Sequence, residues 1–349
     1  MRNRTGTAGL GQLTELAIPL TGSLPFGSWD HRLSFSITPT FLFTGNPLSH
    51  EGSNHQFGLC SLVGTSGQCP SSFGHHYYVQ GVGLNLQYVH HWFSANVGSS
   101  PLGFPIANVL GGVEFAPHLT RNLVLRLKGG RQMVTDSELS YAGMREPITG
   151  EKWGGVTRIQ GHGTLEWGEP NWNVYAGGGF SYLEGTNVND NTGVDVEAGG
   201  SAVVWKADNR QFLRTGLDFI YLNYRSNSYS FSWGQGGYFS PQGYYAIMLP
   251  LEWTGHYCRW TWLLRSEAGY QHYHSKASAF FPMNDGLQSL LNEYTSAQDV
   301  GGVAGNVRGR VVYQLTHKLR MGLEAGYSRA GSWSEISGMI MAHYAFDGL

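Results

Sequence analysis

The side chains of this 349-residue chain that could hold a metal ion are a few histidine pairs and three cysteines. The pairs are His75-His76, His90-His91 and His272-x-His274. A zinc site needs three or four ligands, and the cysteines lie apart from the histidines along the chain. We therefore predict no metal site, and we expect His90-His91 to lie in a turn at a membrane interface.

A second candidate for chemistry is an acid pair. Asp195 and Glu197 lie on one face of an expected strand, about 7 Å apart along it. That separation suits an inverting glycosidase, but no basic or aromatic platform for a sugar flanks the pair. Serine, histidine and acids are numerous enough to leave a catalytic triad open, yet no Gly-x-Ser-x-Gly lies at a strand–helix elbow. We expect no enzyme activity and no cofactor.

The composition favours a β-structure with one apolar and one polar face. Charged residues are 13% of the chain, about half the roughly 25% typical of globular domains, while glycine contributes 50 residues and aromatics 13%. Mean hydropathy is only −0.24. The net charge of −2 and the pI of about 6.7 argue against a nucleic-acid partner.

Hydrophobic residues recur with a period of two along most of the chain. The alternation is clear in Leu33–Ile37, Val82–Tyr88, Leu123–Lys128 and Leu319–Tyr327, and strict alternation indicates half-buried strands. Many apolar runs end in Trp or Tyr, for example Trp167. Apolar bands of about ten residues bounded by aromatic girdles are typical of an outer-membrane β-barrel.

We count fifteen strands and read the chain as one barrel domain, residues 1–349. Bacterial barrels have an even number of strands, short periplasmic turns and long outer loops. Counting back from a last strand that ends in the periplasm, residues 12–22 must run toward the periplasm. The sequence therefore predicts a 16-stranded barrel whose first strand is missing or barely included, with at most its end in residues 1–10; a miscounted strand is the alternative. The expected strands are 12–22, 32–43, 78–89, 91–98, 106–116, 121–131, 153–167, 171–183, 192–206, 210–224, 242–254, 257–272, 299–314, 318–328 and 333–346.

Long loops are expected at 44–77, 132–152, 225–241 and 273–298, the last with a helical turn at 287–294. Cys60 and Cys69 lie in the first of these loops and are candidates for a local disulfide, although two free thiols remain possible; Cys258 stands alone. No apolar run approaches the roughly 18 residues of a membrane-spanning helix. No signal peptide opens the chain, so an exported protein would begin here as a mature fragment or at an engineered start.

If the apolar residues of each strand face lipid, the alternate residues face the barrel interior. One charged side chain facing lipid near the midplane costs roughly 2–4 kcal/mol. The many charges on this face must therefore line water or pair with one another. The charged candidates for the lumen are Glu15, Arg32, Glu114, Arg126, Arg158, Glu166, Asp195, Glu197, Arg214, Asp218, Glu252, Arg259, Arg265, Glu267, Arg308, Arg310, Arg320 and Glu324. The neutral candidates include Asn85, Gln87, His162 and Tyr175.

The two signs of charge nearly balance along this face. A pore for a polyanion is expected to present a basic field, whereas a wall of paired charges, amides and tyrosines suits an uncharged, hydroxyl-rich solute held by weak contacts. The alternative is that the charges only cross-brace the barrel.

The run from Trp233 to Gln242 is a candidate gate. It is rich in glycine and able to fold inward, Pro241 fixes its local φ, and Tyr238 and Phe239 offer rings that can stack on a sugar. The alternative is an ordered outer loop with surface aromatics. Tyr238-Phe239-Ser240-Pro241-Gln242, followed by Tyr244-Tyr245-Ala246-Ile247-Met248-Leu249-Pro250, resembles the C-terminal domain of the cellulose synthase operon protein C family. So does the N-terminal Arg2-x-Arg4-x-Gly6-x-x-Gly9-Leu10-x-x-Leu13-Thr14-Glu15-x-x-x-Pro19-Leu20.

The resemblance implies an outer-membrane porin through which cellulose, an uncharged β-1,4-glucan, leaves a bacterial cell. It implies a 16-stranded barrel in the outer membrane, contact with its lipid, a preceding periplasmic array of tetratricopeptide helices that this chain lacks, and an inner-membrane cellulose synthase complex as a partner. Cys60 and Cys69 depart from the family pattern. Two alternatives stay open: an outer-membrane enzyme acting on lipid or polysaccharide, and a structural or adhesin barrel.

Overall fold

The structure is a computed structural model that describes all residues except 28–30, 46–56, 64–77, 208–209 and 347–349. Its main feature is one large antiparallel sheet. The strands of this sheet's wall are β1 (Arg2–Arg4), β2 (Leu13–Ala17), β3 (Leu20–Pro25), β4 (Arg32–Phe43), β5 (Tyr78–His90), β6 (Phe93–Ser99), β7 (Val109–Phe115), β8 (His118–Thr120), β9 (Leu123–Met133), β11 (Lys152–Glu169), β12 (Trp172–Thr186), β13 (Val188–Ala207), β14 (Gln211–Tyr224), β15 (Tyr244–Tyr257), β16 (Trp260–Ser275), β19 (Gln298–Gln314), β20 (Leu319–Ala330) and β21 (Trp333–Tyr344). The loops contain η2 (Cys60–Val63), α1 (Glu138–Tyr141), β10 (Met144–Arg145), β17 (Ser278–Ala279), α2 (Asp285–Leu291) and β18 (Tyr294–Thr295).

The sheet closes on itself to form a 16-stranded barrel. Consecutive wall strands pair in turn, and β1 closes the ring because it pairs with β2 on one side and β21 on the other. Arg2 lies opposite Glu15 of β2 and Ser337 of β21. The prediction of a sixteenth strand barely present near residue 1 is confirmed, since the three residues of β1 enter the wall.

The expected strand at 12–22 is divided into β2 and β3. Ile18 and Pro19 separate them, because proline has no N–H to donate to a neighbouring strand. The backbone N–H of Ile18 still donates to the carbonyl of Pro39 in β4, and both short strands pair with β4. They therefore occupy one place in the wall, running in the predicted direction.

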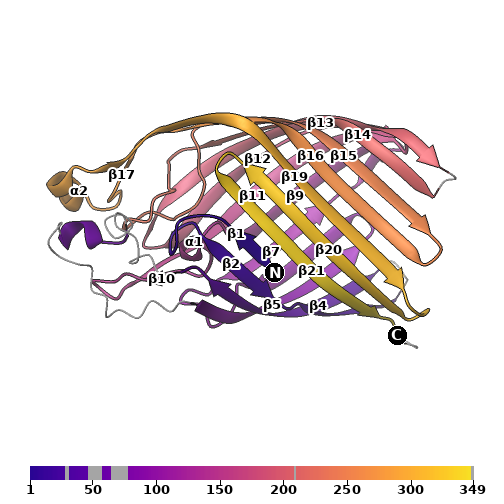
Figure 1. The fold of residues 1–349 in the computed structure, drawn as a ribbon, viewed down its shortest axis with the longest axis horizontal. Helices are drawn as coiled ribbons and strands as arrows, with labels where there is room; N and C mark the ends of the chain where they lie inside the picture. Colours follow the sequence, from indigo (N-terminus) through magenta and orange to yellow (C-terminus); the bar gives the residue numbers. More distant parts are fainter. Residues whose placement is uncertain (28–30, 46–56, 64–77, 208–209, 347–349) are drawn as a thin grey trace.

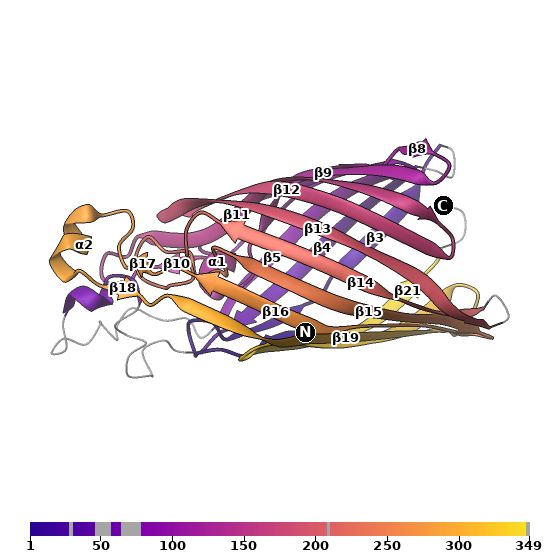
Figure 2. The same ribbon diagram turned by 90° about the horizontal axis from the view of Figure 1, so that it is seen from above.

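The two ends of the barrel differ. Figure 1 shows α1, α2, β10 and β17 gathered at one end, while the other end has short hairpin turns and the C-terminus; Figure 2 shows the same division from above. The expected helical turn is α2, a little earlier than predicted. No helix among the described residues is long and apolar enough to cross a membrane.

The outer face of the wall is apolar between two polar ends. Large side chains that point outward remain accessible, such as Leu84, Leu165 and Leu323. Aromatic rings meet near the short-turn end, including Trp92 with Phe115, whose ring centroids are 4.9 Å apart. A girdle of this kind bounds the lipid-facing band of outer-membrane barrels.

At the long-loop end, loop residues gather at the barrel mouth and several pack against inward side chains of the wall, while α2 lies farther out (Figure 1). We call this assembly the cap; it comprises residues 5–12, 57–63, 100–108, 134–151, 225–243 and 276–297. Its largest core cluster consists of Leu10, Phe57, Cys60, Val134, Leu139, Trp153, Val156, Leu183, Val188, Tyr224, Phe231 and Tyr238. The largest hydrophobic cluster thus lies between the cap and inward side chains at the ends of the wall strands.

A break in β11 places Trp153 in that core. The register with β12 shifts between Gly154 and Thr157, and Gly154 has a φ of +96°, which side chains with a Cβ rarely adopt. A Cβ on Gly154 would come within 2.2 Å of the carbonyl oxygen of Leu139. The glycine lets β11 approach α1 closely, and Trp153 is fully buried as a result.

Candidate functional site

The interior face of the barrel carries the polar set that the sequence assigns to it. On β5, Leu84 and Leu86 point outward and are 42% and 45% exposed, so Asn85 and Gln87 point inward. The Nδ2 of Asn96 donates to the Oδ1 of Asn85 across the hairpin, at 3.3 Å. The same alternation holds along the other long strands.

Many interior charges are paired with each other. Arg126 lies between Glu114 and Glu166, and its Nε is 2.6 Å from an oxygen of Glu166. Glu324 on β20 receives both Arg310 and Arg308 of β19. These pairs span neighbouring strands, so they brace the wall from inside, as the cross-bracing alternative predicts.

The acid pair of the sequence is joined by a histidine. The Nδ1 of His162 is 2.7 Å from Asp195 and its Nε2 is 3.1 Å from Glu197. Thr164 also donates to Glu197. An inverting glycosidase needs a gap between its two carboxylates for substrate and water, whereas here an imidazole fills that gap. The geometry favours a brace over a catalytic pair.

Most of the remaining predicted interior residues also make contacts across neighbouring strands. Arg32, Gln87 and Arg320 make no side-chain hydrogen bond or ion pair within the described part of the chain. The other contacts are Arg265 with Glu252 (2.6 Å), Tyr175 with Asp218 (2.9 Å), Asn306 with Glu267 (3.0 Å), Arg158 with Tyr224 (3.1 Å), Arg214 with Asn173 (3.1 Å) and Arg2 with Glu15 (2.9 Å).

Arg259 differs from its prediction. It lies in the turn between β15 and β16 rather than on the wall, and its guanidinium donates to the carbonyl of Leu315 in the next turn, at 3.4 Å. The expected strand began at 257, but Cys258 adopts a φ of +53°, a conformation of tight turns. Cys258 is an exposed free thiol.

The predicted gate residues form part of the cap, with one correction. Tyr238 is fully buried in the cap core and does not offer its ring for stacking on a sugar. Gly234 and Gly237 have φ values of +93° and +63°, so the glycines turn the segment inward as expected. Phe239 is partly exposed, and its ring packs edge-to-face against Tyr273 of β16.

The other three residues of the predicted gate hold the segment to its neighbours. The Oγ of Ser240 accepts from the N–H of Ser228, at 2.8 Å. The carbonyl of Pro241 accepts from the N–H of Tyr224 at the end of β14, also at 2.8 Å. The Oε1 of Gln242 accepts from the N–H of Lys276. The run is therefore an ordered part of the cap.

A charged network that sequence reasoning missed ties β1 to the cap. Arg4 donates to the backbone carbonyl of Asp136 (2.7 Å) and lies 3.2 Å from Glu335 on β21. The side-chain carboxylate of Asp136 accepts from the N–H of Phe239 through its Oδ2, at 2.9 Å. A continuous path of polar contacts therefore runs from β1 through Asp136 to the gate segment. The Arg2-x-Arg4 spacing, which places both arginines on one face of a strand, is the signal that could have revealed it.

Two further acids of the cap were not singled out from the sequence. Glu146 is fully buried, and it accepts from the N–H groups of Leu59, Ile148 and Thr149. Glu138 begins α1 and accepts from the hydroxyl of Thr44. Burial raises the pKa of Glu138 to about 7. These two acids make their contacts through loop packing, which the alternation of residues along strands does not predict.

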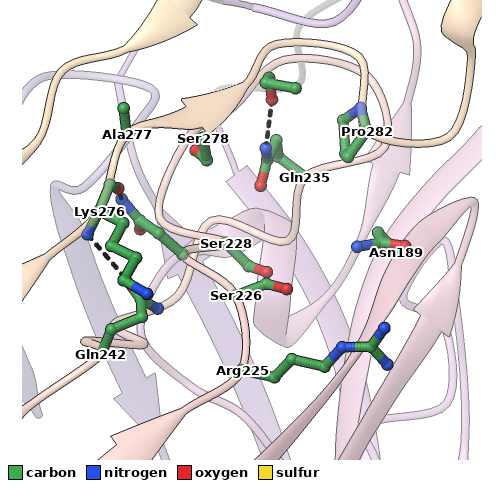
Figure 3. A pocket seen from close by; sticks show the side chains of 12 residues that line it. Asn189, Arg225, Ser226, Ser228, Gln235, Gln242, Lys276, Ala277, Ser278 and Pro282 are labelled. Carbon is green, nitrogen blue, oxygen red and sulfur yellow. Dashed lines mark hydrogen bonds between the residues drawn. The ribbon is translucent and has the colours of Figure 1, made fainter.

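The cap also contains a small polar cavity of about 220 Å³, seen in Figure 3. Hydrogen bonds connect the two segments around it: Gln235 donates to the carbonyl of Ala279, and Gln242 accepts from the N–H of Lys276. Arg225 also lines it. The cap is apolar at its core but polar and hollow toward 276–282.

Other sequence candidates lie in different places. His90 and His91 end β5 and form its turn, as predicted, where the rings of His90 and His31 stack. Cys69, His75 and His76 lie outside the described residues, so the disulfide with Cys60 stays a prediction. Within the described ranges, no three His, Cys, Asp or Glu side chains are grouped to hold a metal ion.

Comparison with known proteins gives a consistent result. Residues 11–347 match the family described as "Cellulose synthase operon protein C C-terminus". A "Cellulose synthase 2 operon protein C" of Komagataeibacter xylinus is 63% identical over all of this chain and 27% of its own length. A "Cellulose synthase operon protein C" of Pseudomonas fluorescens is 29% identical over all of this chain and 26% of its own length. The chain therefore spans about a quarter of the length of these relatives.

Among solved structures, a "Bacterial polysaccharide outer membrane secretin" shares the fold. Its TM-score is 0.57 at 9% identity, with 99% of this chain and 97% of that chain covered. The closed barrel and its apolar outer band suit the bacterial outer membrane, where we place the chain. On its sequence match and its fold, the chain belongs to the family of cellulose synthase operon protein C C-terminal domains.

Proposed function

We propose that this barrel is the outer-membrane channel through which an uncharged exopolysaccharide, a β-1,4-glucan such as cellulose, leaves the cell. The observation that supports this most is the balance of charge on the interior face. Acids and bases pair there in networks such as Glu114–Arg126–Glu166, so little single-signed field remains to concentrate a charged polymer. The names of the relatives point to the same cargo.

The cap is the proposed gate. Its apolar core closes the mouth at the long-loop end, which is the extracellular end if the short turns face the periplasm. A channel of sixteen strands is wide enough to leave an aqueous lumen, so the cap rather than the wall would limit passage. Export then requires the cap to move.

In this proposal the chain acts as a conduit without catalysis or cofactor. The brace formed by His162 between Asp195 and Glu197 supports that choice over a glycosidase. A periplasmic tetratricopeptide region and an inner-membrane synthase would deliver the polymer. Both partners are proposals drawn from the family.

The test is permeability of liposomes that contain the purified barrel. Residues 227–241 are replaced by a short Gly-Ser turn between β14 and β15, and swelling is followed in cellotetraose. The proposal expects faster swelling from the shortened variant than from the intact chain. Equal, negligible swelling of both would instead support a structural or adhesin barrel. Hydrolysis of the sugar would support an enzyme.

A further inference from the structure

One side of the interior wall beneath the cap carries no charge. Two rows of side chains cross four adjacent strands there, β14, β15, β16 and β19, in register. The first row is Leu222, Tyr244, Tyr273 and Val300, and the second is Ile220, Ala246, Gln271 and Gly302. Neighbouring strands lie about 4.8 Å apart, so each row is about 14 Å wide. We call these eight residues the aromatic wall.

Contacts show that the aromatic wall faces inward. The hydroxyl of Tyr244 donates to the Oε1 of Gln271, at 3.2 Å. The adjacent pair Tyr245 and His272 stacks on the opposite face of the sheet, and Tyr245 is 39% exposed there. The ring of Phe239, a residue of the cap, also packs against the aromatic wall.

The wall has a tightly packed apolar border on the side away from the cap. Met248 and Ala304 are buried there against Ala246 of the aromatic wall, and Tyr244 and Ala330 pack on the same cluster. Small residues let the inner surface lie flat beside the tyrosine rings. By contrast, β1, β2 and β21 present Arg2, Arg4, Glu15 and Glu335 to the interior. The mouth is therefore polarised, with an aromatic side and a charged side.

This division fits the chemistry of a β-1,4-glucan. Each pyranose ring with equatorial hydroxyls has two faces made of C–H groups and an edge made of hydroxyls. Aromatic rings suit the C–H faces, while amide and phenol groups such as Gln271 and Tyr273 suit the hydroxyls. A charged polymer would find no counter-ion among these eight residues.

We propose that the aromatic wall is a binding site for a β-glucan chain and that Phe239 occupies it when the cap is closed. This deepens the proposed function and rests on it for the choice of ligand. The ring of Phe239 lies edge-on to Tyr273 with centroids 5.2 Å apart, and 6.1 Å from Tyr244. A glucan ring that reaches the same tyrosines must displace it.

The proposal predicts opposite effects for two truncations. Tyr273→Ala removes part of the surface that holds the sugar, and truncation of a central aromatic contact commonly weakens binding by about tenfold or more. Phe239→Ala removes the competitor, so the affinity for the sugar should rise severalfold. A purely structural role for the two rings would change both affinities in the same direction.

In the experiment, the full barrel chain in detergent is titrated with cellohexaose. Calorimetry measures the affinity, and saturation-transfer NMR on the sugar C–H protons reports which sugar faces contact the protein. Tyr270→Ala is the matched control, because Tyr270 is 48% exposed on the outer face of the same strand. Tyr273→Phe keeps the ring and should retain most of the affinity, even if Tyr273→Ala folds poorly. Heat-modifiable electrophoretic mobility checks the fold of every variant.

The proposal is overturned if the intact chain and Phe239→Ala bind no cellohexaose, or if Tyr273→Ala binds as tightly as Tyr270→Ala. Weaker binding by Tyr273→Ala without tighter binding by Phe239→Ala would overturn the role of Phe239 as a competitor. If sugar passes through the shortened variant but Tyr273→Ala binds cellohexaose as tightly as the intact chain, the channel is retained and the binding site is rejected. If cellohexaose binds more weakly to Tyr273→Ala and more tightly to Phe239→Ala but no sugar passes through the shortened variant, the site is retained and the channel is rejected.

Discussion

In the middle of the barrel, apolar side chains face outward and the enclosed side is charged, whereas in the cap the apolar side chains are enclosed. Leu84 is 42% exposed on the outer face of β5, while Trp153, which packs against the cap from the start of β11, is fully buried. The same residue types take opposite positions because their surroundings differ. Lipid solvates the middle of the wall from outside, but water surrounds the cap, so its apolar groups pack inward. The two regions should therefore respond to different substitutions.

The largest effect is expected from Trp153→Ala. The indole is fully buried, donates to the carbonyl of Gln235 (2.9 Å) and contacts Phe57. Loss of a buried aromatic side chain costs about 3–5 kcal/mol of folding free energy. Here that loss should destabilise the packing of the cap and leave the barrel folded. We expect added protease to cleave the cap of Trp153→Ala more readily than that of the intact chain. The barrel itself should keep its normal mobility in electrophoresis. Trp167→Ala on the outer face of the same strand should leave the cap resistant, and equal sensitivity of both variants would contradict the separation of the two regions.

The next effect tests the wall. Leu84→Lys places a charge against lipid and should destabilise the barrel by about 2–4 kcal/mol. Asn85→Lys, one residue away, places the same charge inside and should cost much less. Urea unfolding in lipid vesicles, followed by tryptophan fluorescence, measures the difference. If both variants unfold at the same urea concentration, the assignment of faces is wrong.

A third effect concerns pH and the cap alone. Glu138 has a pKa raised to about 7 from 4.5 by burial, so the folded cap holds a proton that an open cap releases above about pH 4.5. The stability of the cap should fall as pH rises from about 4.5 to 7 and then level off, by at most about 3 kcal/mol. Hydrogen exchange of α1, corrected for intrinsic rates, measures this. Glu138→Gln should remove the slope, and a slope that persists would point to another group.

The smallest effect is expected where the two regions meet. Arg4→Gln breaks the contacts of β1 with Asp136 and Glu335, and ion pairs that solvent reaches contribute only about 0.2–1 kcal/mol each. The cap should open more often without loss of the barrel, which single-channel recording detects as more frequent openings. Arg329→Gln, at the exposed end of β20, is the control. Identical recordings from both would show that β1 does not hold the cap.

Much of the wall was predictable because lipid imposes a simple rule on every strand. Strand β4 has the predicted bounds, and the parity of the strands required a place near residue 1 that β1 fills. The interior positions followed from the same alternation. Arg259 was misplaced because the tight turn at Cys258 has no recognisable turn motif.

The cap was much less predictable. Tyr238 was expected to be available to a sugar and is buried instead. Nothing in the run Trp233–Gln242 indicates that Asp136, about a hundred residues earlier, accepts from the N–H of Phe239. Such contacts arise from loops of no fixed period, brought together only once the barrel closes.

The amino-acid sequence alone determined the barrel, the face of each strand and the even balance of interior charge, because a period of two decides which side chains meet lipid. Only the tertiary structure decided that the loops pack together at the mouth, that β1 is joined to them through Arg4, and that the ring of Phe239 contacts that of Tyr273. Those arrangements depend on residues far apart in the chain, and closure of the sheet is what brings them into contact.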